Sequence, residues 1–529
     1  MPTAREPDLS IYWGDLHTQF KQQWTKVPLP KFMEDSFKHA REYLDFYGIV
    51  YYPAFYYFES GMKVESVGWR DEFAPEWELV CRLVRKYHEP GRFVTFPGYE
   101  WTGDRTRWGD HNVFHPSDDP PLNLTTNLPD LYADLREQGG IAIPHHTAYL
   151  PGDRGKDWDC YDEDLSPFAE ILSGHGSSEG CDTPIGMPIN LSMGPRTSGG
   201  SIQDGLARGL RVGISASGDN TSGFPGKHGT GLMACCAPEL TREALWEAFG
   251  ARRVYGVTGD RIRLDFRVNG RLMGDVTEGA KAARVQAQVV GTQAIDRIEL
   301  VRNNRVVATH CHNGSWRIPR SGTVRLKVQI EHGWGPMAQN GFEVAPKRWR
   351  ATLTGEGARI VSVEKRLTHG GQRIVALSDR ECTYQLITTP RHGGPMPGNM
   401  QSVVFEIEGK VDARVRLRCG EVDEVLSLRE LMERGHLLVL RKQVTDSIRR
   451  QFGLRSGEYE NWEDAVYHNA YKIKLHRAVP EKGYTASLSF RDDRPRRGRR
   501  PRSGRAWYYL RVSQLNGQYA WSSPIWLDR

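Results

Sequence analysis

The amino-acid sequence predicts an α/β barrel followed by a mainly β, sandwich-like domain with one inserted helical segment. Two patterns predict this fold class. In residues 1–262, short apolar runs alternate with segments of helical periodicity, which indicates a mostly parallel α/β layout. In residues 263–529, β-branched residues recur at strand spacing, which is typical of a β-sandwich. A chain of 529 residues is long enough for two or three domains.

The predicted barrel begins with a short strand at residues 11–13 and a helix from about Lys31, whose apolar residues share one stripe. The unbroken apolar run at 46–51 suits a parallel strand that is buried on both faces. The later elements repeat this alternation, with helices expected at 77–87, 128–135 and 242–249 and strands at 93–96, 141–143, 168–172, 212–215 and 254–257.

Two local signals mark single elements of the second half, the inserted helix and a closing hairpin. Ser427 and Glu430 have the spacing of a capping box, which predicts a helix at 427–434. Asn516-Gly517 separates two apolar runs, which predicts a hairpin. Strands are expected at 285–290, 298–301, 324–330, 403–407, 413–417, 507–512 and 519–527.

Composition and charge exclude several classes of protein. Hydrophobic residues make up 39% and charged residues 26%, which suits a globular protein and excludes a disordered one. No run of about 18 uncharged apolar residues occurs, so no membrane-spanning helix is expected. The net charge of +6 is concentrated at 491–505, which holds eight arginines and two aspartates. The rest of the chain is close to neutral, so we expect no nucleic-acid partner.

The arginine-rich segment 494–505 has two interpretations, a solvated loop or a contact for an acidic partner or another subunit. A homo-oligomer therefore stays open. The eight cysteines form no CxxC pair and match no zinc-finger spacing. The first ten residues lack the apolar stretch of a secretory signal. We therefore expect reduced thiols and a cytoplasmic protein.

Residues that bind metal ions cluster where the predicted strands of the first half end. The C-terminal ends of parallel strands converge on one face of an α/β fold, so these side chains can meet in one pocket. Imidazole and carboxylate together suit zinc, manganese or iron. The candidate residues are Asp15, His17, Glu100, His111, His145, His146, His175 and Asp219.

The string YWGDLH at residues 12–17 resembles the opening motif of the PHP superfamily, the polymerase and histidinol phosphatase group of metal-dependent phosphoesterases. The string AWSSPIW at 520–526 resembles the ending of a large PHP-related family of unknown function. The resemblance implies a distorted (β/α) barrel of PHP type. Further matching strings follow in the family's order: PGYEW at 97–101, DHNV at 110–113, IPHH at 143–146, EILS at 170–173 and SASGD at 215–219.

The chain departs from the family's metal-binding pattern at three places. The opening His-x-His ends here in Gln19. The Asp-His pair after the second strand is replaced by Tyr51-Tyr52, and the last Asp-x-His has Thr221 in place of its histidine. The resemblance therefore implies fewer ions than the family's three. We expect one or two divalent ions (manganese, zinc or iron) per chain.

The resemblance further implies which residues remain as metal ligands. Glu100, His111 and His146 correspond to a complete metal position, and His17, Glu100 and Asp219 remain at the position beside it. Two histidines and one carboxylate form a coherent mononuclear site with coordination positions left for water and substrate.

Catalytic roles are expected for three residues of this cluster. Asp219 or His17 is expected to orient a metal-bound water or to act as general base. His145 is adjacent to His146 and is expected to reach substrate or to pack.

The residues around the cluster predict a small organic substrate with an apolar body and an anionic end. Arginine suits a carboxylate or phosphate, and tyrosines in place of the lost ligands make an uncharged wall. The candidate substrate-binding residues are Arg105, Arg107, Tyr51, Tyr52, His175 and His228.

Hydrolysis of a phosphoester or another bond by a metal-bound water is the function that these features favour. Two alternatives stay open. The first is a non-hydrolytic metalloenzyme, either a lyase or a non-haem iron oxygenase, because two histidines and a carboxylate also serve such oxygenases. The second is a catalytically inactive scaffold of the same fold.

Overall fold

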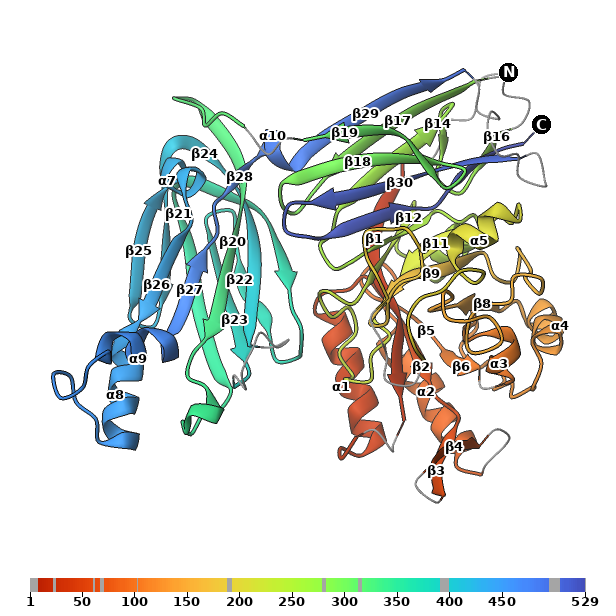
Figure 1. The fold of residues 1–529 in the computed structure, drawn as a ribbon, viewed down its shortest axis with the longest axis horizontal. Helices are drawn as coiled ribbons and strands as arrows, with labels where there is room; N and C mark the ends of the chain where they lie inside the picture. The colour runs from red at the N-terminus through yellow and green to blue at the C-terminus, as the bar shows by residue number, and fades with distance from the viewer. Residues whose placement is uncertain are drawn as a thin grey trace. The chain divides into compact units, whose positions relative to one another are not determined.

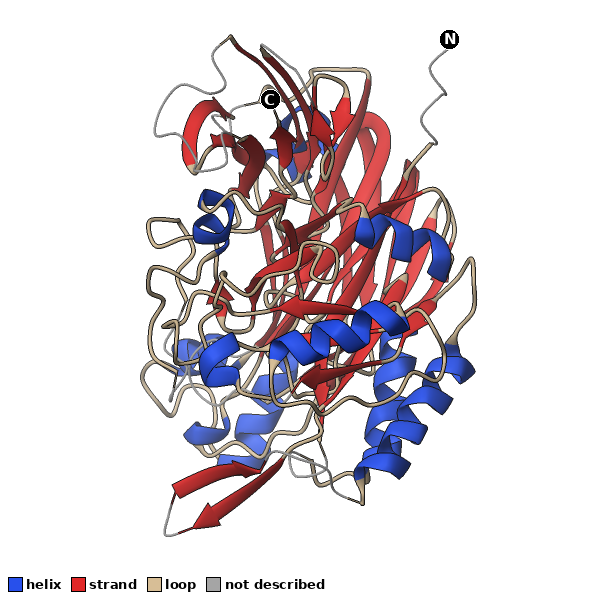
Figure 2. Cartoon of the chain, turned by 90° about the vertical axis from the view of Figure 1, so that its right-hand side faces the viewer, coloured by secondary structure: helices blue, strands red, loops and turns tan. Residues whose placement is uncertain are grey.

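Strands predominate over helices in the computed structural model of the chain (Figure 2). The chain divides into two compact units, each described here by itself. No helix of the described part has the length and apolar character that crossing a membrane requires. The structure describes residues 8–21, 25–59, 62–66, 71–101, 103–187, 193–277, 282–312, 316–390, 399–493 and 505–528.

The first unit comprises Met1–Val290, Asp296–Cys311 and Ser487–Arg529, and the second comprises Gly291–Ile295 and His312–Ala486. This division differs from the expected boundary after residue 262, because the chain leaves the first unit and later returns to it. The segments that return to the first unit pair with strands far away in the sequence, and local sequence patterns do not predict such pairing.

The elements of the first unit follow one another from red to green in Figure 1, and its last strands are dark blue. Its helices are α1 (Leu29–Arg41), α2 (Phe73–Tyr87), α3 (Arg105–Trp108), α4 (Leu128–Gln138), α5 (Ile202–Ala207) and α6 (Arg242–Gly250). Its strands are β1 (Ser10–Phe20), β2 (Phe46–Tyr51), β3 (Phe55–Glu59), β4 (Met62–Ser66), β5 (Val94–Phe96), β6 (Gly98–Trp101), β7 (His111–Phe114), β8 (Ile141–Pro144), β9 (Phe168–Ser173), β10 (Gly176–Ser177), β11 (Gly213–Ala216), β12 (Leu232–Ala237), β13 (Val254–Val257), β14 (Arg263–Val268), β15 (Arg271–Leu272), β16 (Val276–Thr277), β17 (Ala283–Val290), β18 (Ile295–Arg302), β19 (Arg305–Cys311), β29 (Thr485–Asp492), β30 (Ala506–Gln514), β31 (Tyr519–Ser522) and β32 (Ile525–Leu527).

The main sheet of the first unit has the order β16-β32-β30-β31-β13-β12-β1-β2-β6-β7-β8. Strand β1 is parallel to β2 and antiparallel to β12, and β7 is antiparallel to both of its neighbours, β6 and β8. This path is open at both ends, so the described strands form a mixed sheet and the predicted barrel is not confirmed. A separate small sheet, β10-β9-β11, carries the parallel pair β9 and β11.

Helices α1, α2, α4 and α6 lie where their periodicity predicts them. Helix α4 shows the local reason. The side chain of Asn127 accepts a hydrogen bond from the backbone N–H of Asp130, and Gly139 ends the helix in the left-handed conformation at φ 74°. On the main sheet, apolar side chains such as Phe46, Phe96 and Phe249 pack into one core cluster.

The C-terminal string at 520–526 completes the first unit. Tyr255 of β13 pairs with Ser522 of β31, so the end of the chain extends the main sheet. The hydroxyl of Ser523 donates to the carbonyl of Val254 at 2.6 Å and accepts from the N–H of Ile214 at 2.8 Å. These bonds connect the last residues of the chain to strands that precede them by about 300 positions.

The second unit contains one nine-stranded sheet among its described residues, with the main order β22-β23-β21-β24-β20-β27-β26. The predicted capping box is confirmed, because the Ser427 hydroxyl accepts from the N–H of Glu430 and the Glu430 carboxylate accepts from the N–H of Ser427. Its elements are β20 (Thr323–Trp334), β21 (Lys347–Arg366), β22 (Arg373–Leu377), β23 (Glu381–Thr388), β24 (Met400–Cys419), β25 (Val422–Ser427), α7 (Leu428–Glu433), β26 (His436–Leu440), α8 (Arg441–Phe452), α9 (Trp462–Asn469), β27 (Tyr471–Leu475), β28 (Val479–Pro480) and α10 (Glu481–Tyr484).

Candidate metal centre

Strand ends of the first unit bring seven potential metal ligands together, and six of them are among the eight candidates from the sequence; the seventh, Asp110, was not a candidate. His17 lies on β1 and Glu100 on β6, while His145 and His146 directly follow β8. Asp110 directly precedes β7. The remaining two ligands are His175, between β9 and β10, and Asp219, after β11.

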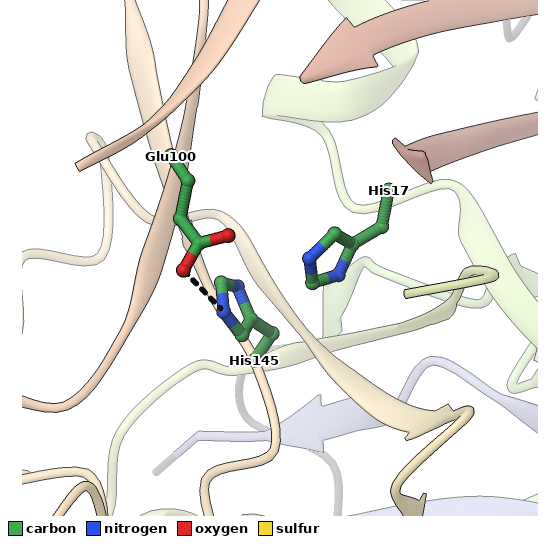
Figure 3. A group of neighbouring side chains, drawn as sticks. All are labelled: His17, Glu100 and His145. Carbon is green, nitrogen blue, oxygen red and sulfur yellow. Dashed lines mark ion pairs between the residues drawn. The ribbon is translucent and has the colours of Figure 1, made fainter. Parts of the chain in front are cut away.

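The first ligand group, called the inner group below, consists of His17, Glu100 and His145. Each residue offers one ligand atom, and these atoms lie within 4.8 Å of one another. The Nε2 atom of His145 is 4.0 Å from Oε1 of Glu100, and the ring of His17 points toward them both (Figure 3). All three side chains are buried, with residue exposures of 0 to 2%.

Two further groups adjoin the inner group through shared histidines. Asp110, His145 and His146 form the second group, and His146, His175 and Asp219 form the third, called the outer group below. The imidazoles of His17, His145, His146 and His175 follow one another in a row, with successive ring centroids 4.3, 4.4 and 4.6 Å apart. The cluster is therefore continuous from buried to partly exposed.

Two histidines of the cluster have ring nitrogens that are available to bind a metal ion. Both ring nitrogens of His145 and the Nδ1 atom of His146 are buried and have no hydrogen-bond partner among the described residues. Buried polar atoms are normally paired, so unpaired nitrogens beside carboxylates indicate lone pairs that a ligand can use. Imidazole nitrogen and carboxylate oxygen are the donors that zinc, manganese and iron accept.

Glu170, on β9, orients His17. The two carboxylate oxygens of Glu170 are each 3.0 Å from Nδ1 of His17. The other ring nitrogen, Nε2, is 3.3 Å from Oδ1 of Asp219. A carboxylate behind a histidine is a common way to fix its tautomer toward a metal. The sequence analysis assigned no role to Glu170, although its position in a predicted buried strand could have indicated one.

Asp15 accepts hydrogen bonds from the backbone around the cluster. Its carboxylate accepts from the N–H groups of His17 at 2.8 Å, Gly218 at 3.1 Å and Gly226 at 2.6 Å. Burial raises the pKa of this carboxyl group, and the three backbone hydrogen bonds oppose that rise. Asp15 is in none of the three ligand groups. It joins two segments that carry ligands, β1 and the loop after β11.

Replacing Asp15 with alanine should therefore destabilise the fold. Two buried N–H groups and the partly buried N–H of Gly226 lose their acceptor. At about 1–3 kcal/mol for each buried group, we expect a loss of at least about 2 kcal/mol in the free energy of unfolding. Urea unfolding measures this value. Asp15→Asn keeps one acceptor oxygen and should lose less, and equal stability of the alanine variant and the parent would contradict this role.

His111 does not join the ligand groups, so the expected set of Glu100, His111 and His146 is not formed. Its Nδ1 atom lies 3.2 Å from the carbonyl of Gly109, and its Nε2 atom lies 3.1 Å from Nζ of Lys156. Both ring nitrogens are thus engaged within the protein. His145 occupies the place beside Glu100 that the sequence assigned to His111.

Arg105 lies at the edge of the inner group, as expected from its position between Glu100 and His111. Its guanidinium is 3.8 Å from Glu100 and 3.1 Å from Asp110, and it donates to the hydroxyl of Tyr52 at 2.7 Å. Burial raises the pKa of Asp110, but Arg154 and Arg105 outweigh it and lower the pKa to about 2. Asp110 therefore stays charged.

Three other predicted substrate residues have their contacts elsewhere. The hydroxyl of Tyr51 donates to Glu76 at 2.5 Å, and His228 pairs with Asp260 at 2.9 Å. The exposed side chain of Arg107 stacks over the ring of Trp108. None of these partners belongs to a ligand group. Among the candidates, Tyr52, Arg105 and His175 lie at the cluster.

Burial and mutual charge shift the pKa values of the inner group. Burial raises the pKa of Glu100 to about 8. Burial also opposes protonation of His17, but Asp219 and Glu170 outweigh it and raise the pKa of its imidazole to about 10. Burial and the neighbouring His17 hold the pKa of His145 well below its usual value, so this imidazole is neutral.

Metal uptake should therefore release protons, and affinity should rise with pH. At pH 6.5, below both raised pKa values, Glu100 and His17 hold protons that a metal ion displaces. At pH 8.5 Glu100 is mostly ionised, so fewer protons are released. Calorimetric titration with Zn²⁺ in two buffers of different ionisation enthalpy measures this release. An affinity that is constant between these pH values would contradict the ligand roles of Glu100 and His17.

Comparison with known proteins adds relatives but no established function. No family model matches the chain. An uncharacterized protein of Chlamydia pneumoniae is 27% identical over 263 residues, which cover 45% of this chain and 42% of that protein. An uncharacterized protein of Chlamydia muridarum is 25% identical over 268 residues, which cover 46% of this chain and 43% of that protein. The chain thus spans less than half the length of these curated relatives.

One solved structure matches the chain at a low level of similarity. It is the crystal structure of a two-domain protein from Bacteroides vulgatus that contains a predicted PHP-like metal-dependent phosphoesterase. The similarity covers 80% of this chain and 98% of that one, at 11% identity and a TM-score of 0.32. At this TM-score the match says nothing about the metal site of the present chain, and the site is described from its own geometry alone.

Proposed function

We propose that the protein is a metal-dependent hydrolase that acts on a small, anionic organic molecule. One observation carries the proposal: the buried inner group of His17, Glu100 and His145, in which neither ring nitrogen of His145 has a hydrogen-bond partner among the described residues. Unpaired buried imidazole nitrogens beside a buried carboxylate are unfavourable unless an ion binds them.

His17, Glu100 and His145 would hold a divalent ion, and that ion would supply a Lewis acid able to lower the pKa of bound water toward about 7. Asp219 is suited to orient such a water or take its proton. Burial raises its pKa, but His17 and His175 outweigh this and lower the pKa, so the carboxylate is charged near neutral pH. Its Oδ2 atom accepts from the hydroxyl of Ser173 at 3.2 Å, which fixes its orientation.

The anionic end of the substrate is assigned to the wall made by Arg105 and Tyr52. The guanidinium of Arg105 donates to the Tyr52 hydroxyl, and its carbon centre lies 5.1 Å from the centre of that ring. Arginine binds carboxylate and phosphate through paired donors. Because Arg105 also neighbours Glu100 at 3.8 Å, an anion bound there lies next to the inner group.

A non-haem iron oxygenase is the second candidate. The observation that favours it is the outer group, whose two histidines and one carboxylate match the ligand set of such enzymes. The two candidates differ in the source of the oxygen atom that enters the product, which is water for a hydrolase and O₂ for an oxygenase.

The test is the reaction of chelator-treated protein after it is restored with Mn²⁺, Zn²⁺ or Fe²⁺. Phosphomonoesters, phosphodiesters and carboxylic esters with a nitrophenol leaving group provide the first substrates. The proposal expects turnover that depends on added metal, and ¹⁸O from labelled water in the product. Consumption of O₂ coupled to turnover would support the oxygenase, and turnover that survives metal removal would contradict both candidates.

A further inference from the structure

We infer that the outer group, His146, His175 and Asp219, binds a second metal ion on the side of the centre that is nearer to solvent. This inference rests on the proposed function, because it assigns a second ion to the same centre. It also changes the role of His175 from substrate contact to metal ligand, and it makes Asp219 a ligand of the outer ion in addition to a group that orients water. The geometry of the three side chains, their supporting contacts and their exposure each point to it.

The outer group has the composition and spacing of a metal site. Its three ligand atoms lie within 4.8 Å of one another, and Nε2 of His175 is 3.1 Å from Oδ2 of Asp219. Two imidazoles and one carboxylate bind iron, manganese or zinc and leave coordination positions for water and substrate.

A hydrogen bond to Tyr149 orients His175, as is usual for a histidine that binds a metal ion. Its Nδ1 atom is 2.7 Å from the hydroxyl of Tyr149. When Nδ1 carries the proton and donates to this hydroxyl, Nε2 presents its lone pair on the side of Asp219. Such contacts behind a ligand fix both tautomer and ring orientation. The Ser173 hydroxyl does the same for Asp219, whose Oδ2 it contacts at 3.2 Å.

His146 has one nitrogen left for the outer group. Its Nε2 atom lies 3.4 Å from Oδ2 of Asp110, whereas its Nδ1 atom is buried and has no hydrogen-bond partner in the described part of the chain. An Nε2–H that points to Asp110 leaves Nδ1 unprotonated.

The backbone at two of the ligands is held in an uncommon conformation. His146 has φ 33° and Asp219 has φ 45°, in the left-handed region that residues with a Cβ atom avoid. Such conformations each cost on the order of 1–3 kcal/mol and persist where the surroundings fix them, often at functional sites. Both residues belong to the outer group.

Exposure distinguishes the two ion positions. The inner group is buried throughout, whereas the side chain of His175 is 13% exposed and that of Asp219 is 4% exposed. An ion in the outer group is therefore nearer to solvent, and its open positions are available to substrate.

The test is the number of ions per chain, measured by elemental analysis after equilibration with Mn²⁺, in the parent, His175→Ala and the matched control His476→Ala. His476 also pairs with a carboxylate, Glu331 at 3.3 Å, but lies in the second unit. We expect two ions in the parent, one in His175→Ala and two in His476→Ala. Electron paramagnetic resonance should show coupled manganese ions in the parent and uncoupled manganese in His175→Ala.

Tyr149→Phe provides a milder variant that keeps all three ligands. Loss of a supporting hydrogen bond typically weakens metal affinity about 10–100-fold, so only the second, weaker binding step should shift by that factor. Two ions in His175→Ala, or one ion in the parent, would overturn the inference. One ion in the parent together with metal-dependent turnover would leave the proposed function standing, whereas a parent that binds no ion would remove both.

Discussion

Replacing Glu100 with glutamine is expected to remove the buried metal ion and reduce hydrolysis to the background rate. Glu100 supplies the carboxylate of the inner group, with Oε1 4.0 Å from Nε2 of His145. Its other oxygen, Oε2, accepts from Nε2 of Gln19 at 2.5 Å. Glutamine has the same shape but no charge, so we expect metal affinity to fall at least about 100-fold, the upper range seen when only a supporting contact is lost.

The Glu100→Gln variant should fold normally, which separates metal loss from unfolding. Burial raises the pKa of Glu100 to about 8, so at pH 7 the metal-free protein holds this carboxyl group mostly protonated and uncharged, like an amide. Metal content and turnover are measured side by side. Glu76→Gln, a change at a half-buried acid that accepts from Tyr51, serves as the control. Full metal content in Glu100→Gln would refute the assignment.

His145→Ala should abolish binding of the inner metal ion and turnover, whereas His111→Ala should retain that ion. His145 belongs to two ligand groups, and both of its ring nitrogens lack hydrogen-bond partners among the described residues. His111 instead contacts Gly109 and Lys156. The sequence resemblance favours the opposite outcome, in which His111 is a ligand and His145 is not.

Elemental analysis of the two variants, beside circular dichroism to verify folding, separates these outcomes. We expect the affinity of His145→Ala for metal to be at least about 100-fold weaker. Loss of a supporting contact alone can cost that much, and His145 is itself a ligand. In His111→Ala the affinity should change by less than about 10-fold. A His111→Ala variant without metal, together with a His145→Ala variant that keeps it, would contradict the geometry.

The sequence predicted the gathering of ligands because strand ends are readable from local patterns. Apolar runs end at polar residues such as His17, His145 and Asp219, and parallel strands converge by a general rule. Which of His111 and His145 is the metal ligand could not be predicted from the sequence. It depends on which way each side chain points from its strand, and on Lys156, which lies 45 positions away from His111 in the sequence and contacts its Nε2.

Long-range pairing explains where the fold prediction was incomplete. The individual strands β30, β31 and β32 were expected as a hairpin of the second domain, but they extend the main sheet of the first unit through pairs such as Tyr255 with Ser522. Local sequence determines that a segment is extended, and it leaves open which partner strand it meets. Sheet closure is likewise a property of the whole path of strands, so the barrel could not be derived from the alternation alone.

Anomalous scattering from crystals grown with Zn²⁺ or Mn²⁺ tests the central claim most directly. The account predicts a peak within about 2.0–2.3 Å of a carboxylate oxygen of Glu100 and a ring nitrogen of His145, the distances of ordinary zinc ligation. A second peak beside His175 and Asp219 is expected at higher metal concentration. A structure whose metal is bound to His111 and not to His145, or one without a peak at either group, would contradict the account.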